Sequence, residues 1–496
     1  MGVVANLNVG QVPRQKKGRV LFICYLFPPV GGAGVQRPVK FIKYLHRLGW
    51  EITVLTVANP SVPVFDQSLM ADVPSDTVVC RAPTLEPDYR YKAKIAGKNG
   101  IAGTTDLPEE GGFHSLMQMM KKVIRSLGGM LLQPDPQVLW LPGASREALR
   151  LLREKPHDLI FATAPPYSSL LLGSWLKNKT GLPLILDYRD EWDLSSAYRE
   201  NSRRDQISLL VQNRMQRNIL RNADGFVATT KASVRQIAER AREFRAQLSG
   251  ICIYNGFDAS DFEKIDETRK VRKENDRVRI VYTGTLWNLT SVEPLVKALE
   301  HLSLISPLLM NKLELIFAGR KMSHQIRLLD RLASTGCRVD VKDYCDHETA
   351  ISLMSSADVL CLLLSDVEGA ERVAPAKLFE YLAMRKEILA IAPYGETAAI
   401  VKRYFPGNHF TGGDIAGIAG WIENRIRAAD KKGGMMGAQR SDDISEFSRE
   451  HQARQLSDYF SRFVHQEAGL AGTGKSSRKE KAGGTVRAKK QRYLCR

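Results

Sequence analysis

The chain has 496 residues, of which 44% are hydrophobic and 25% are charged, and it carries a formal net charge of +18 at pH 7. This length suffices for two or three domains with cores of their own, and no apolar segment reaches the roughly 20 residues of a membrane-spanning helix. Because residues 1–18 contribute +3 and residues 467–496 contribute +7, the chain between them carries about +8, which argues against a specific nucleic-acid interface.

A first series of alternating strands and helices is predicted from residue 19 to residue 245. The opening run RVLFICYLF is continuously apolar and bounded by turn residues, which is typical of a buried parallel strand. The next run, VQRPVKFIKYLHRLG, has apolar residues at helical spacing and ends at Gly49. Further strands are predicted at 50–57, 77–83, 158–166, 183–192 and 224–230, and further helices near 114–132, 143–155, 167–180 and 202–222.

A second series starts with GICIYNGFD, residues 250–258, and continues to about residue 425. Its further strands are predicted at 278–287, 313–320, 337–345, 358–365 and 387–394, with helices near 291–304, 323–335, 347–357, 376–385 and 396–404. Strands that alternate with helices in this way indicate parallel sheets. We therefore predict an α/β protein with two Rossmann-like, doubly wound parallel-sheet domains, at residues 19–245 and 246–425.

Both ends of the chain are predicted to lie outside these domains. Residues 1–18 form a flexible tail, residues 426–466 form helices that pack back on the first domain, and residues 467–496 form a basic, disordered tail with few apolar residues. This tail contains GLAGTGKS, which matches a phosphate-binding pattern. Because that pattern requires a strand before it and a helix after it, we interpret the match as accidental.

Glycines follow the first strand, in the stretch FPPVGGAGVQRPV. Ligands of doubly wound sheets bind at the carboxyl ends of the strands, and a helix N-terminus there can face a phosphate. Gly32 and Gly34 are therefore predicted to approach a ligand. The stretch lacks the third glycine of a dinucleotide fingerprint, and no acidic residue ends the second strand, so a nicotinamide cofactor is disfavoured. A tight turn without a ligand remains an alternative.

Charged residues crowd the end of the strand in LDYRDEWD. Burying charges beside a core strand is costly unless they are paired or take part in function. Asp187, Arg189 and Asp190 are therefore candidate catalytic residues in contact with a substrate. The alternative is structural, with Arg189 paired to Asp187 or Asp190.

The strand ends of the second series carry the remaining candidates. Glycine at a strand end lets backbone amides meet a diphosphate, and a guanidinium suits phosphate oxygens. Lys377 and Glu380 are three residues apart at the start of a predicted helix, where a carboxylate can accept both ribose hydroxyls. A surface salt bridge between these two residues is the alternative. The candidates of this series are Gly284, Thr285, Arg320, Glu371, Pro375, Lys377 and Glu380.

The motifs FPPVGGAGVQRPVKFIKYL, DYRDEW, YNGFD, YTGTL and PAKLFEYLA, in this order, resemble the retaining glycosyltransferases of the two-Rossmann (GT-B) type, specifically family 4. The similarity covers about residues 19–425. It implies a first domain for the acceptor and a second domain for a nucleotide-sugar, facing each other across a cleft, with catalysis that needs no bound metal and no cofactor.

The resemblance also assigns roles to individual residues. It implies that the glycine turn faces the donor diphosphate, that Glu380 holds the ribose, and that Arg320 and Lys377 contact the donor phosphates. The family pairs this glutamate with an earlier one, with seven residues between them, and this chain has Arg372 at the earlier position, with Glu371 adjacent. The family's frequent Arg and Lys after the TG strand are absent from TLWNLTSVEPL.

We therefore expect a cytoplasmic glycosyltransferase that moves a sugar, with retention, from a nucleotide-sugar to a glycan or lipid-linked acceptor in cell-surface polysaccharide synthesis. A nucleotide-sugar epimerase and a non-catalytic sugar-nucleotide-binding partner of a transferase are the alternatives. Seven dispersed cysteines without a CxxC pair indicate a reducing compartment and no zinc site. The amphipathic run at 115–132 is predicted either to dock on an anionic membrane or to cover the domain core.

Overall fold

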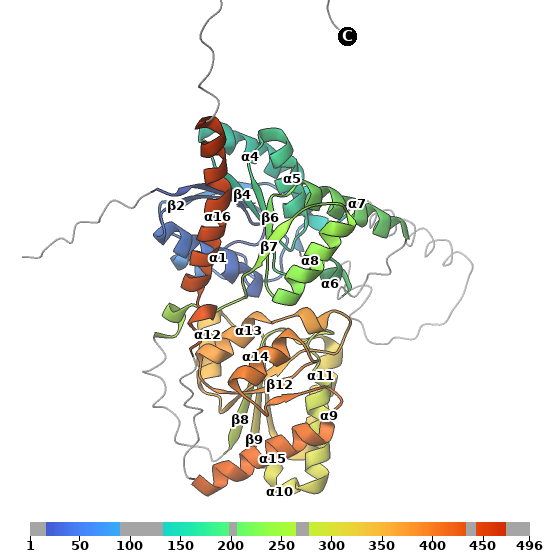
Figure 1. Ribbon diagram of the computed structural model, residues 1–496. Helices are drawn as coiled ribbons and strands as arrows, with labels where there is room; N and C mark the ends of the chain where they lie inside the picture. Colours follow the sequence, from blue (N-terminus) through green and yellow to red (C-terminus); the bar gives the residue numbers. More distant parts are fainter. Residues whose placement is uncertain (1–15, 90–131, 198–205, 264–276, 433–442, 473–496) are drawn as a thin grey trace, which may run out of the picture.

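The computed structural model describes residues 16–89, 132–197, 206–263, 277–432 and 443–472, and it arranges them as two α/β domains, one above the other in Figure 1. One domain has a sheet of seven strands and the other a sheet of six, and all the strand pairs within them are parallel. The predicted fold class, two doubly wound parallel-sheet domains, is confirmed. The uncertain segments include residues 90–131, so the amphipathic run predicted at 115–132 lies outside the described residues except for Leu132.

The first sheet has the order β3-β2-β1-β4-β5-β6-β7. Its strands run out in both directions from the pair β1 and β4, so the loops that follow these two strands diverge and leave room for a ligand. The strands are β1 (Gly18–Ile23), β2 (Trp50–Val57), β3 (Val78–Ala82), β4 (Leu159–Ala164), β5 (Leu184–Tyr188), β6 (Gly225–Ala228) and β7 (Ser249–Cys252).

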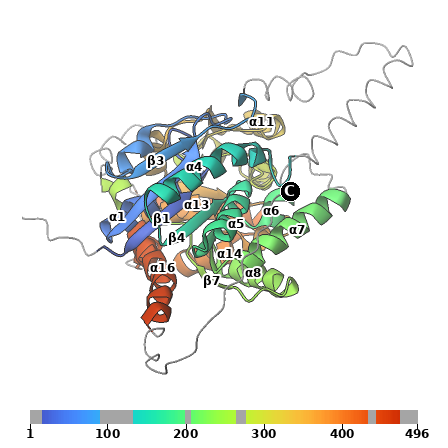
Figure 2. The same cartoon turned by 90° about the horizontal axis from the view of Figure 1, so that it is seen from above.

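Helices cover both faces of this sheet, which is why its central strands are apolar on both sides. In β1, Val20 and Phe22 pack into the core under α1 (Ala33–Arg47), while Leu21 and Ile23 pack into the core on the opposite face. The helices of that opposite face are α4 (Leu141–Glu154), α5 (Ser168–Thr180), α7 (Gln206–Asn222) and α8 (Lys231–Glu243), with the short α6 (Trp192–Ala197) after β5. Figure 2 shows α1 on one side of the sheet and α5, α7 and α8 on the other.

The second sheet has the order β10-β9-β8-β11-β12-β13 and repeats the same plan, with its reversal between β8 and β11. Its strands are β8 (Val278–Thr283), β9 (Leu313–Ala318), β10 (Arg338–Lys342), β11 (Val359–Leu363), β12 (Glu387–Ile391) and β13 (His409–Phe410). Its helices are α9 (Glu293–Ile305), α10 (Pro307–Met310), α11 (Ser323–Asp330), α12 (His347–Ser355), α13 (Ala376–Ala383), α14 (Glu396–Tyr404) and α15 (Ile415–Lys432).

Two segments differ from the sequence prediction. The strand in GICIYNGFD, which was assigned to the second series, is β7 and pairs with β6 of the first sheet. The local pattern of a strand does not reveal which sheet it joins, because both domains are built from strands that alternate with helices in the same way. The last helix, α16 (Arg449–Gly472), includes residues 467–472, which were assigned to the disordered tail.

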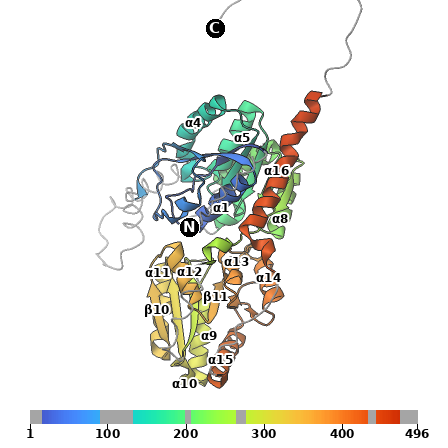
Figure 3. The same ribbon diagram turned by 90° about the vertical axis from the view of Figure 1, so that its left-hand side faces the viewer.

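Helix α16 returns from the second domain and packs against α1 of the first (Figures 1 and 3). Its Phe460 is fully buried, with its ring centroid 5.2 Å from that of Phe161 and 5.5 Å from that of Trp50. These edge-to-face contacts add to the apolar area that the ring buries. The first domain's core is therefore completed by a segment that follows the second domain in sequence.

Truncation of this ring tests that role. We expect Phe460→Ala to lower the free energy of unfolding by about 3–5 kcal/mol, because it leaves a cavity between two aromatic rings. Urea unfolding followed by tryptophan fluorescence measures the change. Asp458→Ala, at an exposed position of the same helix, is the matched control and should stay within about 0.5 kcal/mol of the parent. Equal losses for both variants would contradict the proposed packing.

Candidate functional site

A cavity of about 410 Å³ lies between the two domains, at the carboxyl ends of their strands. Five of the predicted donor-binding residues line it: Gly32, Gly284, Thr285, Arg320 and Lys377. The rest of its lining comes from Leu26, Val30, Gly31, Val62, Pro63, Val64, Trp287, Thr290, Gly319 and Tyr344. Residues from both sheets therefore enclose one space, as the strand order of a doubly wound fold requires.

The glycine turn after β1 forms the first domain's side of the cavity. Gly32 has a φ of 100° and immediately precedes α1, whose first turn carries no acidic residue and whose N-cap makes no side-chain hydrogen bond. The first amides of a helix lack intrahelical partners and carry partial positive charge, so this end of α1 suits an anion. A Cβ atom on Gly31 would lie 2.7 Å from Val64 Cγ1 and 3.2 Å from the Tyr344 hydroxyl, so the two domains meet closely here.

Gly34 has a different place from the one predicted. It is not among the residues that line the cavity. Its carbonyl accepts a hydrogen bond from Arg189 Nη1, and a Cβ atom on Gly34 would lie 2.8 Å from that nitrogen. This glycine therefore admits the buried Arg189 side chain, and the part of the turn that lines the cavity is Gly31 and Gly32.

The ends of β8 and β9 form the second domain's side. Gly284 and Gly319 have φ values of 129° and 128°, which favour glycine. A Cβ atom on Gly319 would lie 2.3 Å from the Gly284 carbonyl oxygen, and one on Gly284 would lie 2.5 Å from Lys377 Nζ. The two glycines keep the strand ends close together and give the lysine its place.

Two cations reach this cavity from the second domain. Lys377 lies in the first turn of α13, with its Nζ 3.9 Å from the centroid of the Tyr282 ring. Burial lowers the pKa of Lys377 to about 7. Arg320 follows β9, is exposed, and has no ion-pair partner within the described part of the chain. Together with the end of α1, these groups give the cavity a positive field from both domains.

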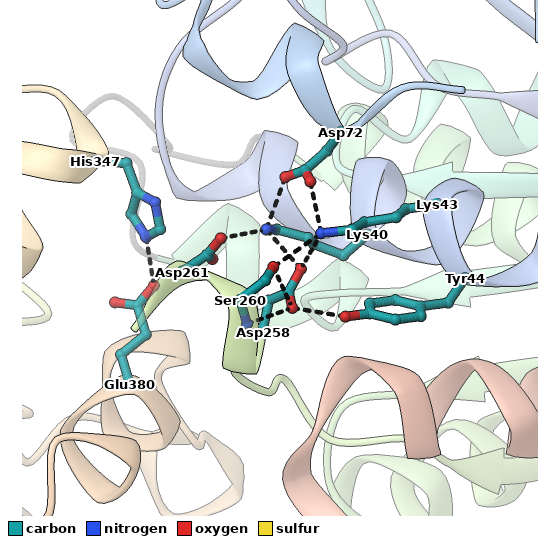
Figure 4. A network of polar contacts seen from close by, with 9 residues as sticks. All are labelled: Lys40, Lys43, Tyr44, Asp72, Asp258, Ser260, Asp261, His347 and Glu380. Atoms are coloured by element: carbon teal, nitrogen blue, oxygen red, sulfur yellow. Dashed lines mark hydrogen bonds and ion pairs between the residues drawn. The ribbon is translucent and has the colours of Figure 1, made fainter. Parts of the chain in front are cut away.

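Glu380 is one turn further along α13 and does not line the cavity. Its Oε1 lies 3.1 Å from His347 Nε2 of α12 (Figure 4). Burial alone would raise the pKa of Glu380, but the contact with His347, the charge of Arg449 and a hydrogen bond from Gln36 together outweigh it and lower that pKa. The reciprocal contact outweighs burial at His347 and raises its pKa. The alternative of a Lys377–Glu380 surface salt bridge is wrong, because the two side chains have separate partners.

Glu371 and Pro375 do not line the cavity either. The Glu371 carboxylate lies at the surface, 2.6 Å from Arg372 Nη1. Arg372 in turn crosses to the first domain, where its Nε is 3.0 Å from both carboxylate oxygens of Glu191. Pro375 occupies the N-cap position of α13. The chain thus uses the loop before α13 to join its two domains.

The charged cluster after β5 is largely structural in its contacts. Asp187 is 1% exposed, forms an ion pair of 3.0 Å with Arg37 of α1, and accepts a hydrogen bond of 2.8 Å from the Thr163 hydroxyl. Arg189 donates to the carbonyl oxygens of Gly34, Ala164 and Pro165. Asp190 is exposed. In the structural alternative, Arg189 would pair with Asp187, but that carboxylate pairs with Arg37 instead.

The sequence analysis missed the charges of α1. Lys40 is 1% exposed, and its Nζ lies 2.7 Å from Asp72, 2.8 Å from Asp258 and 2.6 Å from Asp261 (Figure 4). The three carboxylates are close enough to hold a cation, but the ammonium groups of Lys40 and Lys43 already form ion pairs with them. Charged residues at helical spacing on an otherwise apolar helix face were the signal for this cluster.

With the geometry established, residues 32–247 match the family model described as a glycosyl transferase 4-like domain. The match covers most of the first domain, and it agrees with the resemblance seen in the sequence motifs. A comparison with curated proteins gives no significant match.

Several solved structures share the two-domain fold at low sequence identity. An α,α-trehalose 6-phosphate synthase from Burkholderia multivorans is 12% identical, with a TM-score of 0.54 over 92% of this chain and 100% of that one. The N-terminal domain of a Candida albicans trehalose-6-phosphate phosphatase is 13% identical, with a TM-score of 0.52 over 94% and 99%. An Escherichia coli protein bound to UDP-2-fluoro glucose is 10% identical, with a TM-score of 0.51 over 92% and 99%.

The His347–Glu380 pair gives a pH-dependent stability. The raised pKa of His347 means that its contribution is complete below its ordinary value and is lost as the pH rises through the raised value. We expect His347→Gln to cost about 1.5–3 kcal/mol at pH 6 and clearly less at pH 9, as a hydrogen bond between charged groups is lost. Urea unfolding at the two pH values measures this. His301→Gln, at an exposed position, is the control, and a loss that does not vary with pH would exclude the charged pair.

Proposed function

We propose that this chain is a glycosyltransferase that transfers a sugar from a nucleotide-sugar to a glycan or lipid-linked acceptor. One observation carries the proposal: the amino-terminal end of α1, Lys377 and Arg320 converge from two domains on a single cavity. A nucleoside diphosphate is the ligand whose charge and extent suit that arrangement. The E. coli neighbour is bound to UDP-2-fluoro glucose, so uridine diphosphate is the first nucleotide to test.

The reaction requires that negative charge developing on the departing diphosphate be stabilised. Fixed donors and cations that already point at that charge give the largest single contribution to such catalysis. The amides at the start of α1 and the Lys377 ammonium would bind the diphosphate oxygens, and Arg320 would reach the outer phosphate. In this proposal these groups supply the positive charge, and neither a metal ion nor a cofactor is required.

The proposed pathway is retaining. The bond between the anomeric carbon and the diphosphate breaks through an oxocarbenium-like state, and the acceptor hydroxyl attacks from the side on which the diphosphate leaves. A diphosphate oxygen takes the acceptor proton. Glu380 is proposed to accept hydrogen bonds from the ribose, with His347 holding its carboxylate in the ionised state. No protein nucleophile is assigned.

On the acceptor side, we propose that Asp187 and Arg189 act as positioning residues. Their contacts with Arg37 and with the carbonyl of Gly34 hold α1 and its glycine turn in place. We further propose that the acceptor belongs to a cell-surface glycan made from the cytoplasmic side. Among the described residues, no helix has the length and apolar character needed to cross a membrane.

A non-catalytic role in binding a sugar nucleotide is the second candidate. The observation in its favour is Arg372, which stands where the resemblance places a glutamate and which binds Glu191 instead. An epimerase has no comparable support, because no pair of acid and base side chains faces the cavity among its lining residues. Turnover distinguishes a transferase from a protein that only binds.

Loss of the two cations tests the transferase. We expect Lys377→Met and Arg320→Ala each to lower the rate of sugar transfer by about 100-fold or more, the usual cost of removing one electrostatic donor from a transition state. Transfer is measured as the incorporation of radiolabelled sugar from UDP-sugars into extracted glycolipid. Arg327→Ala, at an exposed position of α11, is the control. If the parent binds UDP but never turns over a donor, the non-catalytic role replaces the proposal.

Binding of UDP should depend on pH through Lys377. Burial lowers the pKa of Lys377 to about 7 in the protein without ligand. Above that pH, Lys377 must therefore take up a proton when a diphosphate binds. We expect the dissociation constant to rise by up to about tenfold per pH unit between pH 7.5 and 9, as one proton is taken up per ligand. Calorimetry in buffers of different ionisation enthalpy measures the uptake. Lys377→Arg should bind with no such dependence, and a flat profile for the parent would exclude this role.

A further inference from the structure

Helix α7 carries a long exposed face on the outside of the first domain. Its members recur at spacings of three and four residues and are Ile207, Leu210, Val211, Arg214, Arg217, Asn218 and Arg221, all of them exposed. The opposite face, with Ile219 and Leu220, is buried in the domain core. The outward face is therefore continuous over the whole helix, and we call these seven residues the α7 face.

The composition of the α7 face is unusual for a surface in water. Its amino-terminal half exposes three aliphatic side chains, with Ile207 at 55%, Leu210 at 69% and Val211 at 37%. Its carboxyl-terminal half has three arginines, and none of its seven residues is acidic. Arg214 and Arg221 have no ion-pair partner in the parts of the chain that the structure describes. Contiguous exposed apolar side chains next to unpaired cations indicate a binding surface.

A hollow of about 500 Å³ beside α7 extends this surface. Its lining combines cations with apolar groups: Leu210, Asn213, Arg214, Arg217, Arg240 and Phe244. The guanidinium carbons of Arg217 and Arg240 lie 5.4 Å and 4.6 Å from the centroid of the Phe244 ring. Arg240 is held by Glu243, at 2.7 Å, and by Asn213. The hollow thus has an apolar floor and a basic rim, with one carboxylate already paired.

Position also matters for what binds here. Figures 1 and 2 both place α7 at the outer edge of the first domain, where it packs on α5 and α8. The residues of the hollow and those of the interdomain cavity form two sets with no member in common. A partner on the α7 face would therefore contact none of the residues that line the cavity.

We propose that the α7 face and the adjoining hollow dock on an anionic membrane surface. Ile207, Leu210 and Val211 would enter the boundary between head groups and acyl chains, while the arginines bind lipid phosphates. This site is distinct from residues 115–132, and it does not depend on the proposed function, because vesicle binding is measured without donor or acceptor.

Charge reversal tests the electrostatic part. The full chain is sedimented with phosphatidylcholine vesicles that contain or lack phosphatidylglycerol. Each basic side chain near an anionic surface is worth about fivefold in affinity, so the double variant R214E/R217E should bind anionic vesicles at least about 25-fold more weakly. The control is R146E/R327E, which changes the charge equally at two other exposed arginines that lack ion-pair partners among the described residues. Equal losses in both variants would overturn the proposal.

Depth measurement tests the apolar part independently of the basic ends of the chain. Leu210→Trp places a fluorophore on the α7 face, and Leu308→Trp places one at a position of the second domain that is 81% exposed. Brominated lipids should quench the added tryptophan fluorescence of the first variant and not that of the second. Absence of quenching at position 210 would overturn membrane docking. Light scattering gives a second test. If the parent forms a dimer that R214E/R217E abolishes, a second copy of the chain occupies the α7 face, and membrane docking is overturned.

Discussion

The charged face of α1 is the constraint on which the rest of the structure depends. Arg37 and Lys40 are both 1% exposed, and each is fully engaged, Arg37 by Asp187 and two backbone carbonyls and Lys40 by three carboxylates. Removing one partner of such a buried group would leave an uncompensated charge, which is strongly destabilising. Two of the carboxylates, Asp258 and Asp261, belong to the connection that leads into the second domain. One helix therefore fixes the first sheet, the interdomain connection and the glycine turn at its own amino terminus.

That arrangement explains how a site made from two domains can be positioned accurately. The amides at the start of α1 are held by ion pairs further along the same helix, while Lys377 is held by its packing over Tyr282. On the far side, Arg372 binds Glu191 and the Glu396 carboxylate accepts a hydrogen bond of 2.7 Å from the Ala232 amide. Two polar contacts thus join the domains outside the cavity. In the proposed function, a diphosphate between them would meet groups that need little rearrangement, which is the condition for strong electrostatic stabilisation.

Arg372 departs from the residue that the resemblance implies, and the structure shows what it contacts instead. The resemblance places a glutamate at this position, and a carboxylate there would face Glu191 across the domain boundary. The arginine converts that repulsion into an ion pair of 3.0 Å, which Ser233 supports with a hydrogen bond of 2.6 Å to the same Glu191 carboxylate. Where the resemblance implies a carboxylate, this chain therefore has an ion pair between its domains. The charged groups that line the cavity are cations, Arg320 and Lys377.

By itself, the sequence determined the fold class and the cations of the site. Continuous apolar strands, helical spacing and glycines at strand ends are local signals, and a doubly wound sheet gathers its strand ends at one edge, so Gly32, Gly284, Thr285, Arg320 and Lys377 were placed together correctly. Only the tertiary structure decided which partners the buried charges have. Arg37 meets Asp187 across 150 residues, Lys40 meets Asp261 across 221, and β7 and α16 join the first domain from beyond its predicted end. Such pairings depend on how the chain returns on itself, and no local pattern records them.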